Sequence, residues 1–214
     1  LKRLPLRFTY DDNYFAHPHQ GIPREGYTAA VASILDHPNI SVRLGQTAES
    51  VDDDAVDHVV YTGPIDRYFD YAEGRLSYRT LRFEEELHDA PYQGTAVLNY
   101  CDEDVPHTRI TEHMYFAPWE AAEFDRSIIY REYSAAAGPG DIPYYPVRLL
   151  DDKAMLERYV ARARATPGVT FAGRLGSYAY LDMDKSIARA FDVAEHLEHC
   201  MARGVAPDTF VHEI

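Results

Sequence analysis

The chain has 214 residues, of which 46% are hydrophobic and 26% charged. A chain of this length buries most of its apolar surface on folding, so a packed globular protein is expected. The formal net charge of −14 disfavours non-specific binding to nucleic acid or anionic lipid, because both attract positive surfaces. An anionic ligand must therefore meet a local group of arginines.

Cysteine content and hydropathy indicate the compartment. Cys101 and Cys200 are the only cysteines, and they lie too far apart in the sequence to suggest a disulfide framework. No apolar run approaches the ~20 residues needed to span a bilayer, and no signal peptide is recognisable. We therefore expect a cytoplasmic protein without membrane insertion. The 17 tyrosines suit a surface that binds a polar ligand, since each combines an apolar ring with a hydroxyl group.

The first part of the chain mixes strand and helix patterns. Residues 1–15 alternate like a strand, residues 27–35 suit a helix, and residues 41–45 predict a short strand. The apolar segment 59–61 does not alternate, which indicates a strand covered on both faces, as in an α/β sheet. A glycine and a proline end this strand, and a short helix is predicted after it.

Residues 76–134 have a different character. Four longer segments with strand patterns, separated by clusters of turn residues, predict an antiparallel sheet. These segments are 77–87, 94–100, 109–116 and 127–133. A loop rich in glycine and proline then leads out of the sheet.

The next segment returns to helix and strand patterns. A helix is predicted from about residue 152 to residue 165, with Asp151 or Asp152 as its N-terminal cap. A buried strand is predicted at residues 169–172. The order α/β, then β, then α/β predicts two lobes, with the antiparallel sheet inserted between parts of one α/β lobe.

The final helix has clear signals at both ends. It is predicted over residues 183–203, with Asp182 as the N-terminal cap and Gly204 as the stop. His196 and His199 share one face of it, but so near the helix end they are expected to be solvated rather than to bind a metal.

Common catalytic and nucleotide-binding motifs are missing from the sequence. No G-x-G-x-x-G follows a strand, so the chain has no dinucleotide fingerprint, and no G-x-S-x-G nucleophile motif is found. Arg3, Arg7, Arg109 and Arg174 occupy strand or strand-end positions, from which a side chain can point into a cleft. Surface charge or an ion pair with an acidic residue is the more common explanation for any single arginine.

Two groups of tyrosines are candidates for ligand binding. The P-Y-Y-P loop stiffens the backbone around Tyr144 and Tyr145, which lowers the entropy lost when a hydroxyl group meets a ligand. A rigid packed corner is the alternative. Tyr178 and Tyr180 are two residues apart and face the same way if the segment is extended, where their hydroxyls can bind phosphate oxygens.

Several blocks of the sequence resemble the bacterial UDP-galactopyranose mutases. They are R-F-T-Y-D-D-N-Y-F, Q-G-I-P-R-E-G-Y-T, Y-T-G-P-I-D-R-Y-F-D-Y, P-H-T-R-I-T-E-H, G-D-I-P-Y-Y-P-V and G-R-L-G-S-Y-A-Y-L-D-M-D. The resemblance follows the family order from Arg3 to about Ala190, and therefore covers nearly the whole chain. One departure is Glu25–Gly26, where the family usually has two glycines.

The resemblance implies an isomerase that interconverts UDP-galactopyranose and UDP-galactofuranose, for galactofuranose-containing cell-surface glycans. Reduced FAD is the implied cofactor, and it forms a covalent adduct with the sugar without net redox change. The implied partners are the two nucleotide sugars, and family members are commonly homodimers. No metal is implied.

The resemblance also assigns site residues, position by position. Arg3, in a mobile loop, and Arg109 match the arginines that hold the pyrophosphate during catalysis. The implied substrate-binding residues are Tyr14, Phe15, Asn99, Tyr145 and Tyr180, and the implied cofactor-binding residues are Gly173, Arg174, Asp182 and Met183. The N-terminus of the last helix carries about +0.5 charge, and pointed at the flavin it would stabilise the anionic reduced ring.

The fold implied by the resemblance is part of a Rossmann-like FAD-binding domain with an inserted antiparallel-sheet substrate domain. The expected segments are a mobile-loop remnant and first sheet strand at 1–20, part of the FAD-binding domain at 21–63, the substrate domain at 64–147, and the C-terminal part of the FAD-binding domain at 148–214. The family's N-terminal FAD-binding motif has no counterpart here. We therefore expect a C-terminal portion that binds FAD weakly or not at all and is inactive alone.

Two other readings of the sequence are an amine-oxidase-like flavoprotein and a non-catalytic sugar-binding β module. The first also ends with a strand, a glycine-rich turn and a helix at the flavin, but it predicts an aromatic cage in place of Arg3 and Arg109. The second fits the tyrosine content and the missing cofactor motif. Titration with UDP separates them, because a simple glycan binder ignores the pyrophosphate.

Overall fold

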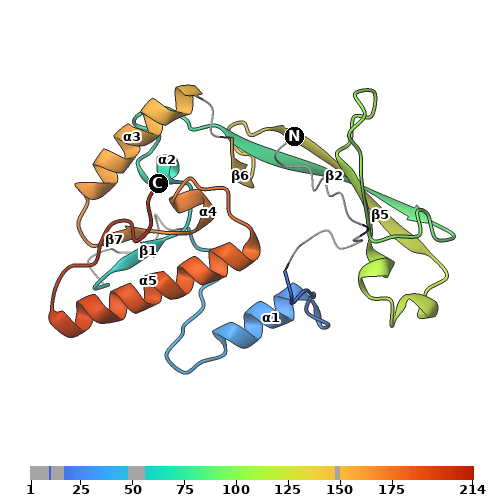
Figure 1. Ribbon diagram of the computed structural model, residues 1–214, viewed down its shortest axis with the longest axis horizontal. Helices are drawn as coiled ribbons and strands as arrows, with labels where there is room; N and C mark the ends of the chain where they lie inside the picture. The colour runs from blue at the N-terminus through green and yellow to red at the C-terminus, as the bar shows by residue number, and fades with distance from the viewer. Residues whose placement is uncertain (1–9, 11–16, 48–55, 148–149) are drawn as a thin grey trace. The chain divides into compact units, whose positions relative to one another are not determined.

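The computed structural model describes residue 10 and residues 17–47, 56–147 and 150–214, apart from the side chains of 150 and 151 (Figure 1). The chain divides into two compact units, residues 1–44 and 45–214. The predicted strand at 1–15 lies outside the described residues, apart from Tyr10. The domain limits expected from the family resemblance stay a prediction.

The first unit contains the helix α1, Gly26–Leu35, close to the predicted bounds. The strand predicted at residues 41–45 is wrong, because these residues form no strand. Leu44 and Gly45 make a turn, and Gly45 has φ of +70°, a left-handed conformation that interrupts an extended chain.

Two parallel strands form the smaller sheet of the second unit. β1 (Val59–Tyr61) pairs with β7 (Val169–Phe171), with Val59 opposite Val169. Residues 62–168 separate the two strands and contain the whole antiparallel sheet, which confirms the predicted insertion. β7 is buried throughout, but Val60 of β1 is 43% exposed, so the expectation that this strand is covered on both faces is wrong.

Four helices accompany the small sheet. α3 (Leu150–Arg164) and α5 (Met183–Arg203) lie on opposite sides of it, and the short helices α2 (Ile65–Tyr68) and α4 (Gly173–Gly176) follow β1 and β7 (Figure 1). α5 has the predicted bounds and ends at Gly204, whose φ of +64° suits a glycine. Among the described residues no helix is long and apolar enough to cross a membrane.

The small sheet and its four helices form the α/β lobe, and the core of this lobe is aromatic. Tyr61, Tyr159, Phe171 and Tyr178 are almost fully buried and belong to one cluster with Ile65. The rings of Tyr61 and Phe171 meet edge to face, with centroids 5.7 Å apart. Burial of a side chain the size of Phe171 contributes about 1.5–3 kcal/mol, so this cluster is a main source of the lobe's stability.

Asp152 connects α3 to the larger sheet and does not cap the helix. Its Oδ1 accepts hydrogen bonds from the Ser77 N–H at 3.3 Å and from the Ser77 hydroxyl at 2.9 Å. The prediction that Asp152 is the cap was wrong, because α3 begins earlier, at Leu150. The side chain of Asp151 lies outside the described residues.

Five strands form the larger, antiparallel sheet in the order β3-β4-β5-β2-β6. They are β2 (Tyr78–His88), β3 (Val97–Asn99), β4 (Arg109–Glu112), β5 (Ser127–Ala136) and β6 (Tyr145–Pro146). The four predicted strands are confirmed, but β3 and β4 are shorter than expected. After Glu112 the chain forms the 3-10 turn η3 (His113–Phe116), and a second such turn, η4 (Ala121–Glu123), precedes β5.

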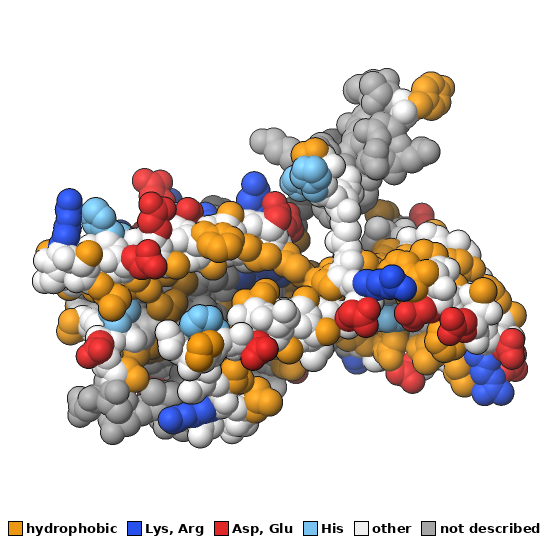
Figure 2. Space-filling model, turned by 90° about the horizontal axis from the view of Figure 1, so that it is seen from below, with side chains coloured by type: hydrophobic (Ala, Val, Ile, Leu, Met, Phe, Trp, Pro, Cys, Tyr) orange, Lys and Arg blue, Asp and Glu red, His pale blue; other side chains and the backbone are white. Residues whose placement is uncertain are grey.

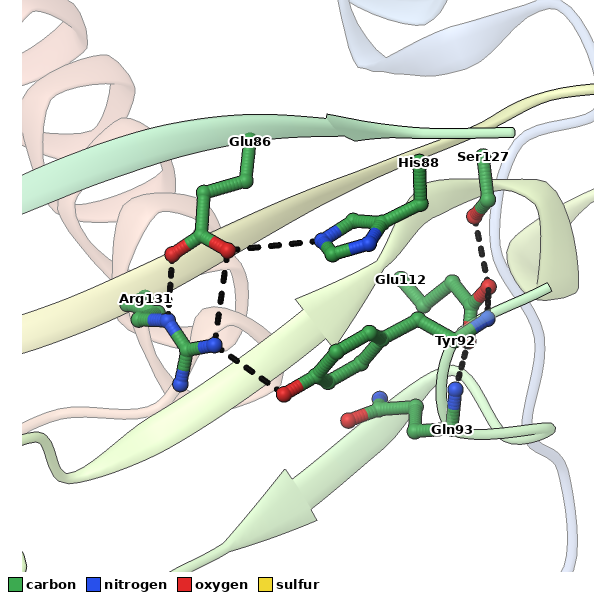
Figure 3. Close-up of polar contacts among 7 residues, drawn as sticks. All are labelled: Glu86, His88, Tyr92, Gln93, Glu112, Ser127 and Arg131. Atoms are coloured by element: carbon green, nitrogen blue, oxygen red, sulfur yellow. Dashed lines mark hydrogen bonds and ion pairs between the residues drawn. The ribbon is translucent and has the colours of Figure 1, made fainter. Parts of the chain in front are cut away.

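Glu112 anchors the connection between β2 and β3 (Figure 3). Its carboxylate is buried and accepts hydrogen bonds from the N–H groups of Tyr92 and Gln93, both at 2.8 Å, from the Gly94 N–H at 3.1 Å and from the Ser127 hydroxyl. Burial by itself raises the pKa of Glu112, but these donors together hold it below its usual value. The ionised carboxylate therefore fixes where β3 begins.

A second polar network lies on the same face of the sheet. Arg131 binds the carboxylate of Glu86 and donates to the Tyr92 hydroxyl at 3.0 Å, and Glu86 lies 3.3 Å from His88 (Figure 3). Strand alternation places Arg131 and Arg109 on opposite faces, because Arg131 lies opposite Ile110. This network therefore supports the sheet from the face away from Arg109.

Buried hydrogen bonds join the start of β2 to the α/β lobe. Asp66 accepts from the Leu76 N–H at 3.0 Å and from the Tyr78 hydroxyl at 3.2 Å. The Tyr178 hydroxyl donates to the Ser77 carbonyl at 2.7 Å, and the rings of Tyr78 and Tyr178 meet edge to face. Burial raises the pKa of Asp66 in spite of its donors. These contacts hold the sheet against the α/β lobe.

Candidate functional site

A row of side chains crosses one face of the larger sheet. Asn99 of β3 lies opposite Arg109 of β4. Arg109 in turn lies opposite Glu132 of β5, which lies opposite Phe83 of β2. Residues directly opposite in an antiparallel pair project from the same face. The register therefore brings together two residues that the sequence analysis assigned to the site, Asn99 and Arg109.

Glu132 holds the guanidinium group of Arg109. Nε of Arg109 lies 3.1 Å from Oε1 of Glu132, and this oxygen also accepts a hydrogen bond from the Thr108 hydroxyl at 2.8 Å. The Glu132 side chain is 11% exposed and the Arg109 side chain 47%. The Nη groups of Arg109 make no hydrogen bond to any residue that the structure describes. A ligand oxygen can therefore reach them from solvent.

The same face continues along β2 to Arg79, which lies opposite Tyr145 of β6. Arg79 and Phe83 are four residues apart on the strand, which corresponds to about 14 Å at ~3.4 Å per residue. A ligand that contacts both Arg109 and Tyr145 must therefore be extended along the sheet.

Tyr145 and Tyr180 form a pair at the end of this face. Their rings meet edge to face with centroids 5.6 Å apart, and the Arg174 guanidinium lies 5.5 Å from the centre of the Tyr180 ring. Tyr180 is 52% exposed and Tyr145 is partly buried. The structure thus brings together three of the expected site residues that come from two separate segments.

Arg174 links the two segments that carry these tyrosines. It donates from Nη1 to the Tyr144 carbonyl at 3.2 Å, and from Nε at 2.9 Å and from Nη2 to the Leu181 carbonyl. Tyr144 precedes Tyr145, and Leu181 follows Tyr180. The guanidinium group therefore sets how far apart the two tyrosines stand.

Tyr178 does not share a face with Tyr180, so that prediction was wrong. Tyr178 has φ of +45°, which is left-handed and breaks the extended conformation that the prediction assumed. Its ring is buried, at 1% exposure, where its hydroxyl reaches the Ser77 carbonyl. Tertiary packing thus decides the backbone here, and only Tyr180 is available to a ligand.

The residues expected to contact a cofactor lie after the C-terminal end of β7 and at the start of α5. Gly173 opens α4 with φ of +73°, and a Cβ atom there would come no closer than 3.7 Å to Thr62. Met183 is exposed in the first turn of α5. Asp182 is the N-cap of α5, as predicted, but its side chain makes no capping hydrogen bond. Asp184 adds a second acidic side chain in the first turn of the helix.

A hollow of about 390 Å³ lies between α5 and the carboxyl ends of β1 and β7. Most of its wall is apolar, with Val60, Ala172 and Val193 among the residues that line it. Figure 2 shows hydrophobic side chains among charged ones on the face of the molecule seen from below. Ligands of open parallel sheets bind beyond the carboxyl ends of the strands, so the hollow is a reasonable place for an apolar ring.

The structure leaves some expected site residues undescribed. Arg3, Tyr14 and Phe15 lie outside the described residues. His199 is exposed, as expected, whereas His196 is only partly exposed and its Nε2 accepts a hydrogen bond from the Asp208 N–H at 3.0 Å. In the described ranges, no three histidine, cysteine, aspartate or glutamate side chains form a cluster that could hold a metal ion.

Two residues of this face, Glu132 and Arg79, could not be recognised from the sequence alone. Glu132 is one polar residue in an alternating strand, and Arg79 is one of several arginines, so neither carries a local signal. Their place in the site follows from the register, which puts Glu132 beside Arg109 and Arg79 beside Tyr145.

The sequence is similar to a family model and to several relatives that are named as nucleotide-sugar mutases. Residues 1–180 match the family model for UDP-galactopyranose mutase. A probable UDP-galactopyranose mutase of Klebsiella pneumoniae is 52% identical over 195 residues, which cover 91% of this chain and 50% of the relative. The dTDP-fucopyranose mutase of Escherichia coli is 48% identical, with 91% of this chain and 53% of the relative covered. The UDP-galactopyranose mutase of Mycoplasma pneumoniae is 34% identical, with 92% and 53% covered.

The fold also resembles that of a solved structure. A crystal structure of reduced UDP-galactopyranose mutase superposes with a TM-score of 0.53 at 14% sequence identity, covering 75% of this chain and 48% of that chain. The chain spans about half the length of the curated relatives it matches. Because the family model matches residues 1–180 of the 214, the chain belongs to the UDP-galactopyranose mutase family.

Proposed function

We propose that this chain supplies the nucleotide-sugar side of a mutase that interconverts UDP-galactopyranose and UDP-galactofuranose. The observation that carries the proposal is the pairing of Asn99 with Arg109 on an open sheet face, in a chain of this family. A cation beside an amide suits a ligand in which a sugar hydroxyl lies close to a phosphate.

Arg109 is proposed to bind the pyrophosphate through its Nη groups. One arginine about 4 Å from a phosphate charge supplies roughly 4 kcal/mol of gross attraction at an effective dielectric constant near 20, before desolvation is subtracted. Such local attraction can exceed the repulsion from a chain of net charge −14. Arg3 is proposed to add a second cation, and Tyr14 and Phe15 to contact the uridine. These three roles rest on the family resemblance alone.

Tyr145 and Tyr180 are proposed to donate their hydroxyls to the same phosphates. Their rings already pack together, and Arg174 fixes the two backbone segments that carry them. Little side-chain entropy is therefore lost when a phosphate binds. Phosphates held in this way stay in place while the bond to the sugar breaks and re-forms.

The cofactor is proposed to be FAD, which in its reduced form supplies the nucleophile for the anomeric carbon. Gly173, Arg174, Asp182 and Met183 are proposed to face it. The residues present fit such a group, because Met183 is exposed and the neighbouring hollow is mostly apolar. The backbone N–H groups at a helix N-terminus favour an electron-rich ring edge.

A second candidate substrate is dTDP-fucopyranose, which is favoured by the 48% identity to the dTDP-fucopyranose mutase of Escherichia coli. Both candidates present a nucleoside diphosphate to Arg109. Titration of the chain with UDP and with dTDP by calorimetry tests which base is preferred. Binding of galactose without any preference for the diphosphate would instead support a sugar-binding module.

A further inference from the structure

Glu132 is fixed from two directions at the centre of the candidate site. The Thr108 hydroxyl donates to its carboxylate at 2.8 Å and Nε of Arg109 lies 3.1 Å away. The Thr108 N–H also donates to the Glu132 carbonyl at 2.8 Å. The side chain is nearly buried, so this carboxylate has one defined position.

A carboxylate at this place has two opposite effects on a bound diphosphate. By holding Nε it restricts the Arg109 guanidinium to one orientation and leaves the Nη groups for the ligand. By its negative charge it repels the phosphates and lowers their affinity. The repulsion between the carboxylate and the phosphates would be a disadvantage in a site whose function is only to bind an anion tightly.

We propose that Glu132 is a positioning residue, which orients Arg109 toward the diphosphate and at the same time limits how tightly the diphosphate is held. The inference rests on the proposed function. The chemistry gives a reason for this double role. The diphosphate must leave the sugar and attack it again, and the nucleotide sugar must finally be released. Both steps need a well-oriented diphosphate more than a tightly bound one.

The experiment is a titration of the chain with UDP by calorimetry, at two salt concentrations, for wild type, Glu132→Gln and Glu132→Ala. Glutamine keeps an oxygen that accepts hydrogen bonds but removes the charge, whereas alanine removes both. Glu85→Gln is the matched control. Glu85 is on the neighbouring strand β2 and on the same face of the sheet as Glu132, but its carboxylate contacts Tyr130 instead of Arg109.

We expect Glu132→Gln to bind UDP several-fold more tightly than wild type, with a steeper loss of affinity in salt. Glu132→Ala should bind about tenfold more weakly than Glu132→Gln, because the guanidinium group is no longer oriented. Glu85→Gln should stay close to wild type. Equal binding by the glutamine and alanine variants would overturn the proposal, as would an equal effect of Glu85→Gln and Glu132→Gln.

The Nε–H resonance of Arg109 in a nitrogen-edited NMR spectrum tests the positioning without any ligand. It should be sharp in wild type and Glu132→Gln and lost to exchange in Glu132→Ala. If Glu132→Ala does not fold, Thr108→Val serves instead, since it loosens the carboxylate and should weaken UDP binding; unchanged binding would overturn the proposal. Should the chain and its Arg109→Ala variant both fail to bind UDP, the proposed function is wrong, and the resonance still decides the role of Glu132.

Discussion

Asn99 and Arg109 lie directly opposite each other on β3 and β4, with their side chains on one face of the sheet. If Asn99 contacts the sugar while Arg109 contacts the pyrophosphate, the two residues should affect different ligands. We expect Asn99→Ala to lower the affinity for UDP-galactose about fivefold to tenfold through the loss of one hydrogen bond, and to leave UDP affinity unchanged. Parallel calorimetric titrations check this, and an equal loss for both ligands would argue against a sugar contact.

The hydrogen bonds of Arg174 lead to a second prediction, which concerns stability and the tyrosine pair. Lysine keeps the charge of Arg174 but cannot bond the Tyr144 and Leu181 carbonyls together in the same plane. We expect Arg174→Lys to lower the free energy of unfolding by about 1.5–3 kcal/mol in urea denaturation. The ring resonances of Tyr145 and Tyr180 should shift together. Unshifted resonances would mean that the arginine does not set the tyrosine pair.

The buried carboxylate of Glu112 predicts how stability depends on pH. Its pKa in the folded protein lies below the value of about 4.3 for an unfolded glutamate, so its contribution is fully present above that pH. That contribution is lost as the pH falls through the folded pKa. Glu112→Gln should cost about 1.5–3 kcal/mol at pH 7, because an amide matches the four donors poorly.

Urea denaturation of wild type and Glu112→Gln at pH 7 and pH 4 measures this dependence. The gap between the two proteins should narrow at the lower pH. A gap that does not change between the two values would show that ionised Glu112 does not hold the connection between β2 and β3.

Elements with a local signal could be predicted from the sequence. β1 and α5 have the predicted bounds, because an apolar run before a glycine and a proline, and a periodic pattern that ends at Gly204, are read within a few residues. The strand pattern in residues 77–133 likewise predicted the antiparallel sheet. The family resemblance supplied Asn99 and Arg109, and their proximity could be seen only from the register.

What could not be predicted depends on contacts between distant residues. The left-handed conformation of Tyr178 follows from the burial of its ring against Tyr78, which lies far away in the sequence. Asp152 and Asp182 both looked like helix caps, but the first is drawn to Ser77 and the second makes no capping bond. Glu132 has no local signal, because its neighbour Arg109 is on another strand.

The two aspartates give a matched pair of substitutions. Asp182→Ala should change the free energy of unfolding by no more than about 0.5 kcal/mol, since no side-chain capping bond is lost. Asp152→Ala should cost about 1–3 kcal/mol, because it leaves the partly buried Ser77 N–H and hydroxyl without their acceptor. Urea denaturation of both variants makes the comparison, and a larger cost for Asp182→Ala would show that its side chain bonds to the first turn of α5 in solution.

The chain by itself is expected not to catalyse the proposed interconversion. It has no G-x-G-x-x-G after a strand, which is the motif that cradles the FAD pyrophosphate in open α/β domains. We therefore expect no conversion of UDP-galactofuranose when the purified chain is incubated with FAD and dithionite and the sugars are separated by chromatography. Conversion above the protein-free control would mean that FAD can be held without that motif.

The most direct test of the account is UDP binding to the chain with and without Arg109. Arg109→Ala removes the cation on the open face, whereas Arg82→Ala removes an exposed arginine from the opposite face and serves as the control. The account predicts measurable UDP binding by wild type and Arg82→Ala in calorimetry, and a loss of at least about tenfold in Arg109→Ala. Equal affinity of all three proteins for UDP would contradict it.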